Sequence, residues 1–153
     1  MSRMAKSSGR FPAMTTPELA EAKQAVLSAS TEIAQVFGHD HLRLVPDGQG
    51  GLWAEINEIR LGDPYVQETS FVICLLPFNL PAADVYPLFL RSDLSRSDGR
   101  ALGEGFQATA VSWPGDAQPR PVVQVSRRTR GNAFTLQTPR QKIEKVLDWV
   151  RNQ

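Results

Sequence analysis

The side chains with the clearest chemical potential gather near the C-terminal end of the sequence, where every charged residue between Ala117 and Ile143 is basic. These residues are Arg120, Arg127, Arg128, Arg130, Arg140 and Lys142. Clustered positive charges attract an acidic protein and fix its orientation. The same arginines could instead contact nucleic-acid phosphates, with Phe134 or Trp113 stacking on bases. A third interpretation is a solvated surface whose charges balance acidic groups elsewhere in the chain.

The overall composition favours the protein partner. Lys and Arg together number 17, and Asp and Glu 16, so the formal net charge is +1. A protein that works by bulk charge attraction needs a larger excess, and no recognised nucleic-acid motif is present. Nucleic acid is therefore not an expected partner.

Other reactive side chains are few. Cys74 is the one cysteine, which excludes an internal disulfide and an all-cysteine metal site. It lies within the apolar run FVICLLP, where burial disfavours the thiolate, so we expect it to be structural. His39 and His41 lie on one side of a predicted strand, but a tetrahedral metal site would need further ligands that only carboxylates could supply. We therefore expect no metal.

Two apolar runs organise the predicted fold. Residues 71–76 have no polar interruption, which is typical of a strand covered on both faces near the middle of a sheet. Pro77 should end its pairing, because proline has no amide hydrogen. A rigid connection containing Pro81 and Pro87 then leads to the second apolar run, residues 88–90.

A helix is predicted on each side of this pair. Thr15 and Glu18 have capping-box spacing, and apolar residues recur at helical spacing until Gly38. Thr138 and Gln141 repeat the capping signal before a second amphipathic stretch. Its apolar residues are Ile143, Val146, Leu147 and Val150.

Between these helices the sequence predicts strands at residues 39–45 and 53–61, then residues 71–76 and 88–90, without an intervening helix. This order implies an antiparallel meander. Residues 103–115 are predicted to be irregular, and Val123 and Val125 mark a last short strand or an extended segment over the sheet.

The whole chain therefore predicts one α+β domain over residues 15–153, preceded by a flexible basic tail at residues 1–14. The hydrophobic share of 41% is ordinary for a globular protein. Because we find no membrane span and no signal peptide, we expect a cytoplasmic protein.

This order of elements resembles the ubiquitin-conjugating (UBC) superfamily. There, an N-terminal helix precedes a four-stranded antiparallel meander, a Pro-rich "PxxYP" segment links the last two strands, and an irregular active-site crossing leads to a helix packed on the sheet. Short motifs here are similar to those of bacterial members from ubiquitin-like conjugation or phage-defence operons. The matching pieces are Leu75-Leu76-Pro77, Tyr86-Pro87, Phe89, Asp93, Asp98-Gly99-Arg100 and Ser126-Arg127-Arg128. The resemblance covers roughly residues 42–150.

The family carries its cargo on a cysteine preceded by a His-Pro-Asn motif, and this chain has neither. The resemblance therefore implies an acyl transferase that holds a ubiquitin-like protein as an oxyester on Ser126, where the family places its nucleophile. A serine needs a base or strong anion stabilisation. Arg127 and Arg128 could stabilise the oxyanion. The candidate bases are Asp93, Asp98, His39 and His41.

The alternative that the resemblance leaves open is a non-catalytic UBC-like subunit, which needs a binding surface but no nucleophile. In both cases the implied partners are a ubiquitin-like protein and its adenylating activating enzyme, and the domain itself needs no nucleotide or metal. Of the two, the sequence favours the transferase. The partner-binding candidates are Arg120, Arg130, Asn132 and Tyr86.

Overall fold

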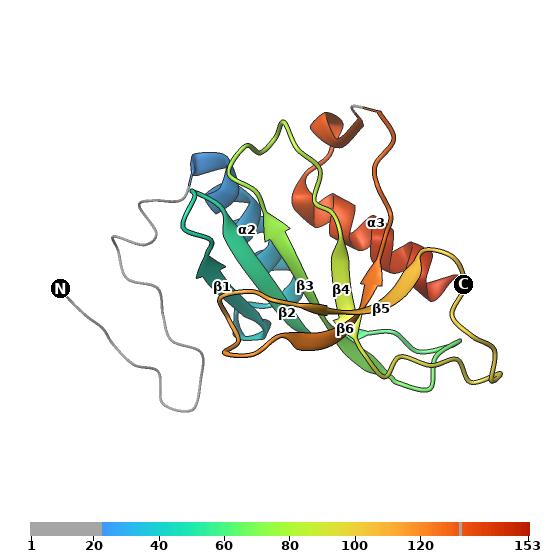
Figure 1. Ribbon diagram of the computed structural model, residues 1–153. Helices are drawn as coiled ribbons and strands as arrows, with labels where there is room; N and C mark the ends of the chain where they lie inside the picture. Colours follow the sequence, from blue (N-terminus) through green and yellow to red (C-terminus); the bar gives the residue numbers. More distant parts are fainter. Residues whose placement is uncertain (1–22, 132) are drawn as a thin grey trace.

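The computed structural model describes residues 23–153 with the exception of residue 132. Two helices, α2 (Gln24–Phe37) and α3 (Pro139–Arg151), lie on one face of an antiparallel sheet (Figure 1). Short 3-10 turns, η1 (His39–His41) and η2 (Ala133–Leu136), precede the first strand and α3. The six strands are β1 (Leu42–Pro46), β2 (Leu52–Arg60), β3 (Thr69–Leu76), β4 (Leu88–Arg91), β5 (Phe106–Val111) and β6 (Arg120–Val125).

The strand order is β1-β2-β3-β4-β6-β5, and every neighbouring pair is antiparallel. The predicted α+β class, with a helix before the antiparallel sheet and a helix after it, is confirmed. The sheet is larger than the expected four-stranded meander, because β6 adds to β4 and β5 adds to β6. β1 to β4 lie side by side in the order of the sequence, whereas β6 lies beside β4 and β5 lies at the edge of the sheet.

β3, which contains the uninterrupted apolar run at residues 71–76, lies inside the sheet between β2 and β4, as predicted. In β3, Val72, Ile73, Cys74 and Leu76 have no solvent-exposed surface. Burial raises the pKa of the Cys74 thiol to about 12, so it stays protonated and packs as a small apolar group. The structural role expected for this cysteine is therefore confirmed.

The capping box predicted for the C-terminal helix is also present. The Thr138 hydroxyl accepts a hydrogen bond from the Gln141 amide at 3.2 Å, and the Gln141 side chain accepts one from the Thr138 amide at 2.8 Å. Gly38, at a φ of 102°, ends α2 as predicted. The predicted helix start at Thr15 and the basic tail at residues 1–14 lie outside the described residues.

Two predicted elements are wrong in detail. Residues 39–41 form η1, and the first strand begins only at Leu42. The segment predicted to be irregular contains β5, in which Gln107, Ala108, Thr109 and Ala110 are all exposed. Apolar and polar residues alternate in β5, but two of its alternating apolar positions, Ala108 and Ala110, are alanines, which are depleted in strands, so its strand signal is weak.

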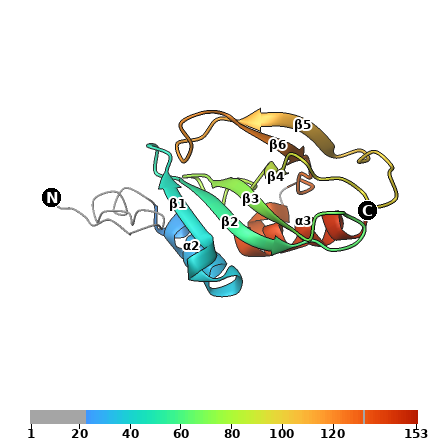
Figure 2. The ribbon, with the colours of Figure 1, turned by 90° about the horizontal axis from the view of Figure 1, so that it is seen from below.

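Apolar clusters occupy both faces of the sheet. The larger cluster lies between the sheet and the two helices, and includes Ile33, Leu90 and Leu147. The β5–β6 pair turns over the opposite face, as Figure 2 shows. There a second cluster forms from Ile73, Phe89, Val111, Trp113 and Val122. Among the described residues, the helices are too short or too polar to cross a membrane.

Candidate functional site

The segment after β6, residues 126–130, contains four of the residues singled out from the sequence, Ser126, Arg127, Arg128 and Arg130, and we call it the basic segment. Its first amide, that of Ser126, donates to the Gly105 carbonyl at 2.8 Å and extends the β5–β6 pairing by one step. Thr129 is held from the other side, with its amide and its hydroxyl both donating to the Asp84 carboxylate, at 2.8 and 3.0 Å. The backbone of the basic segment is therefore fixed at both ends.

The arginines between these anchors rest on aromatic rings. The guanidinium carbon of Arg127 lies 4.5 Å from the ring centroid of Trp149, and that of Arg128 lies 3.9 Å from the centroid of Tyr86. Both arginines are exposed. Trp149 is itself stacked on Phe106 at 5.2 Å. Cation–π contacts of this kind hold a guanidinium in place while its polar edge still faces solvent.

A buried ion pair between Lys142 and Asp84 contacts the basic segment through Thr129. The Lys142 ammonium donates to both oxygens of Asp84, at 2.8 Å each, and to the Thr129 hydroxyl at 2.9 Å. Lys142 is only 3% exposed. Burial acts to raise the pKa of Asp84, but the hydrogen bonds from Lys142 and Thr129 outweigh it and hold the pKa below its ordinary value. These contacts join the Pro-rich connection, the basic segment and α3.

The candidate nucleophile, Ser126, is half-buried at the start of the basic segment. Its hydroxyl accepts a hydrogen bond from the Gln124 side-chain amide at 3.2 Å. The described hydrogen-bond partners of Ser126 are thus a carbonyl and an amide, and neither acts as a base at neutral pH.

The structure places the candidate bases elsewhere. Arg91 lies opposite Val122 in the β4–β6 pair, so Asp93 follows one end of that pair and Ser126 follows the other. The three residue steps from Leu88 to Arg91 alone separate the two ends of the pair by about 10 Å. Asp93 is exposed and paired with Arg91, whose hydrogen bonds lower its pKa.

The remaining candidate bases are also engaged or distant. Hydrogen bonds from the Arg96 side chain and the Arg100 amide lower the pKa of Asp98 to about 2, which makes this carboxylate a poor base. His39 and His41 precede β1, and β2, β3 and β4 lie between β1 and β6. At the usual strand spacing this separation is about 19 Å.

The six basic residues predicted as one surface divide into two groups. Arg120, Arg140 and Lys142 each form an ion pair with a carboxylate of another element, namely Glu55, Glu32 and Asp84. Among the described residues, Arg127, Arg128 and Arg130 form no ion pair and are exposed. Tyr86 belongs to the site as the ring beneath Arg128, whereas Asn132 lies outside the described residues.

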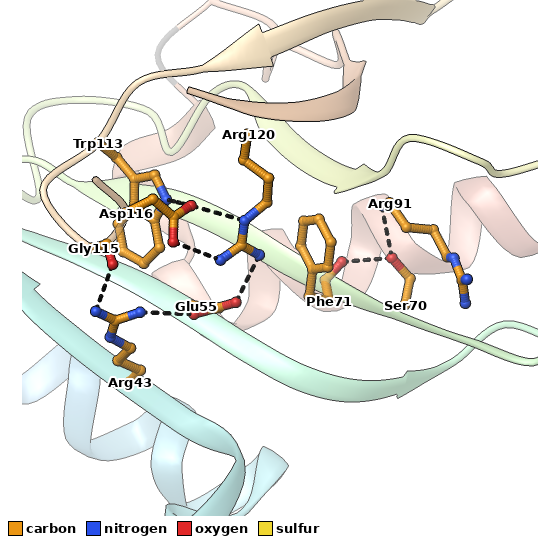
Figure 3. Close-up of polar contacts among 9 residues, drawn as sticks. All are labelled: Arg43, Glu55, Ser70, Phe71, Arg91, Trp113, Gly115, Asp116 and Arg120. Carbon is orange, nitrogen blue, oxygen red and sulfur yellow. Dashed lines mark hydrogen bonds and ion pairs between the residues drawn. The ribbon is translucent and has the colours of Figure 1, made fainter. Parts of the chain in front are cut away.

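The contacts of Arg120, which the sequence did not predict, are shown in Figure 3. Its guanidinium donates to Glu55 at 2.8 Å and to Asp116 at 2.8 and 3.1 Å, and lies over the Phe71 ring. Asp116 also accepts from the Trp113 indole at 2.8 Å. Glu55 is 4% exposed. Arg120 is therefore committed to joining the β5–β6 pair to β2.

Arg43 completes this network. It lies 3.6 Å from Glu55 and donates to the Gly115 carbonyl at 2.6 Å. The signal that could have revealed the network is Glu55 itself, a charge between Ala54 and Ile56 in an apolar strand. A buried carboxylate of this kind requires a cationic partner.

A groove of about 780 Å³ lies beside the basic segment, between α2, the Pro-rich connection and the start of α3. Its charged lining residues are Glu32, Asp84 and Lys142. All three have ion-pair partners within the protein, Glu32 pairing with Arg140 and Asp84 with Lys142. The groove therefore offers a ligand mainly hydroxyl, amide and apolar groups.

Comparison with known proteins leaves the family of the chain open. A scan against protein-family models, a search of curated proteins and a search of solved structures each found no match. The basic segment is thus the feature from which function must be argued, since it combines exposed charge with a fixed backbone.

Proposed function

We propose that the protein is a non-catalytic binding module, which holds an acidic protein partner against the basic segment. The observation that carries this proposal is the seating of two exposed guanidinium groups on aromatic rings, Arg127 on Trp149 and Arg128 on Tyr86. Exposed arginine, tyrosine and tryptophan side chains are the residues that dominate protein interfaces.

The fixed geometry favours binding. Ordering a long side chain at an interface costs about 0.5–1.5 kcal/mol, and a side chain already held on a ring loses less. The backbone between the two arginines and Thr129 is anchored through Asp84, so the spacing of the charges is also set in advance. A partner with correspondingly spaced carboxylates gains charge-assisted hydrogen bonds at a reduced entropic cost.

The resemblance to the UBC superfamily indicates the class of protein to which the proposed partner belongs. Under this proposal the chain is a UBC-like subunit without acyl-transfer activity, and its partner is a ubiquitin-like protein or its activating enzyme. The absence of the family's cysteine and the position of Ser126, whose described hydrogen bonds are to Gly105 and Gln124, both support binding over transfer.

The oxyester hypothesis is the second candidate. The observation in its favour is the position of Ser126, half-buried at the start of the basic segment and directly before Arg127. It requires a base that reaches Ser126 on binding of the partner, because Asp93, Asp98 and the two histidines are engaged or distant.

A single incubation separates the two candidates. The protein is mixed with a ubiquitin-like protein, its activating enzyme, ATP and magnesium, and the products are analysed by size-exclusion chromatography and denaturing gel electrophoresis. We expect a complex without a covalent adduct, formed equally well by Ser126→Ala. An adduct that survives thiol reductant, is cleaved by hydroxide and is lost in Ser126→Ala would establish the transferase instead.

A further inference from the structure

β5 forms an open edge of the sheet. Among the described residues it pairs only with β6, and its four central residues, 107–110, are exposed. It contains no charged residue and no proline, and its register with β6 is unbroken. Natural sheets usually protect an edge with charges, proline or a bulge, because an unprotected edge pairs with another strand.

The opposite edge shows this protection. β1 carries Arg43 near its start and ends at Pro46. It is also shorter than β5, and all its residues are partly buried. The two edges of one sheet therefore differ in the feature that controls strand pairing.

The backbone groups available on β5 follow from its pairing with β6. The Ser126 amide donates to the Gly105 carbonyl, so in the alternating antiparallel pattern Gln107 and Thr109 also exchange hydrogen bonds with β6. Pro121 lies opposite Ala110 and has no amide hydrogen, which agrees with this alternation. The amides and carbonyls of Ala108 and Ala110 consequently point outward, away from β6.

We propose that this edge pairs with β5 of a second copy of the chain, antiparallel, about a twofold axis at Ala108. The sequence of the strand is complementary to itself in that register. Ala108 meets Ala108 of the second copy, Phe106 meets Ala110, and Gln107 meets Thr109. Each pair joins a small side chain to another side chain, and no like charges meet.

The symmetry of this arrangement is what selects a second copy over an unrelated strand. A twofold axis perpendicular to the sheet preserves its faces, so α2 and α3 of both copies lie on the same side of one continuous sheet. The formal net charge of +1 opposes association of two copies very little. Because the contact consists mainly of backbone hydrogen bonds between small residues, the dimer should be weak and should form as the concentration rises.

Analytical ultracentrifugation of the purified full chain tests the proposal. The wild type should shift from monomer to dimer with rising concentration, and Ala108→Asp should remain monomeric, because two carboxylates would meet on the axis. The matched control is Ala101→Asp, which adds the same charge at an exposed loop position and should dimerise like the wild type. A wild type that stays monomeric at every concentration, or an Ala108→Asp variant that dimerises equally, would overturn the proposal.

Amide hydrogen exchange then locates the contact. The amides of Ala108 and Ala110 should exchange more slowly as concentration rises, whereas those of Gln107 and Thr109 should be protected at all concentrations by β6. Dimerisation without this protection at Ala108 and Ala110 would place the interface elsewhere and contradict the proposal. Protection of Gln107 and Thr109 in Ala108→Asp verifies that the variant keeps the β5–β6 pair.

Discussion

At the residue scale, the decisive distinction is between basic side chains that are neutralised inside the protein and those that are presented to solvent. Lys142 and Arg127 lie in the same uniformly basic stretch of sequence, yet Lys142 is buried on Asp84 and Arg127 is exposed on Trp149. The sequence predicted the charge of this stretch correctly. It could not separate the two roles, because the partners of these residues come from other elements, far away along the chain.

The first prediction concerns the buried ion pair between Lys142 and Asp84. Lys142→Met should lower the free energy of unfolding by about 3–5 kcal/mol, because Asp84 would be left buried without its cation. Urea unfolding measures the change. Lys145→Met is the matched control, on the exposed side of the same helix, and should change stability by less than about 0.5 kcal/mol. The double variant Asp84→Ala/Lys142→Met should regain part of the loss, and equal stability of Lys142→Met and Lys145→Met would contradict this account.

The same pair predicts a pH dependence. The pKa of Asp84 is lower in the folded protein than in the unfolded chain, so the folded state binds this proton less readily. The resulting stabilisation is complete above the unfolded pKa and is lost as the pH falls through about 4 toward the folded pKa. Urea unfolding at a series of pH values should therefore show stability decreasing on acidification. Asp84→Asn should flatten part of this decrease, and an unchanged slope in that variant would assign the effect to other carboxylates.

At the element scale, the β5–β6 pair is the feature that the sequence did not reveal in full. β3 and α3 were predictable because burial imposes an uninterrupted apolar run on the first and helical spacing with a capping box on the second. The four central residues of β5 are exposed, so burial imposes no apolar pattern on them. Its position instead depends on contacts made just before and at the start of β6: Trp113 packs in the second apolar cluster, and Arg120, which is bonded to Asp116, reaches Glu55.

A comparison of Arg120 with Arg127 tests how the elements are joined. Arg120→Met should destabilise the protein by about 2–3 kcal/mol, less than the about 3–5 kcal/mol for a fully buried pair, because the Arg120 side chain is 24% exposed. Arg127→Met, by contrast, should change stability by less than about 0.5 kcal/mol, since its partners are a ring and solvent. Thermal or urea unfolding of both variants makes the comparison. Equal losses from the two would contradict the division into a structural arginine and an interaction arginine.

At the scale of the whole molecule, the sheet carries the two helices on one face and the second apolar cluster and the β5–β6 pair on the other, and the basic segment lies where β6 leads toward α3 (Figures 1 and 2). The α+β class and the order of helix, sheet and helix were predictable from periodicity and capping signals. The site was predictable in part: the sequence indicated its arginines, but not that Tyr86 and Trp149 would lie beneath two of them. Those contacts join positions more than 20 residues apart, which local patterns cannot encode.

The most direct test of the binding proposal is calorimetric titration of the protein with a ubiquitin-like protein and, separately, with its activating enzyme. We expect the wild type to bind at least one of them, and Arg127→Glu/Arg128→Glu to bind that partner at least about tenfold more weakly, a loss of about 1.4 kcal/mol. Arg100→Glu, at an exposed loop position, serves as the charge-reversal control and should bind like the wild type. Failure of the wild type to bind either protein, or undiminished binding by the double variant, would contradict the account.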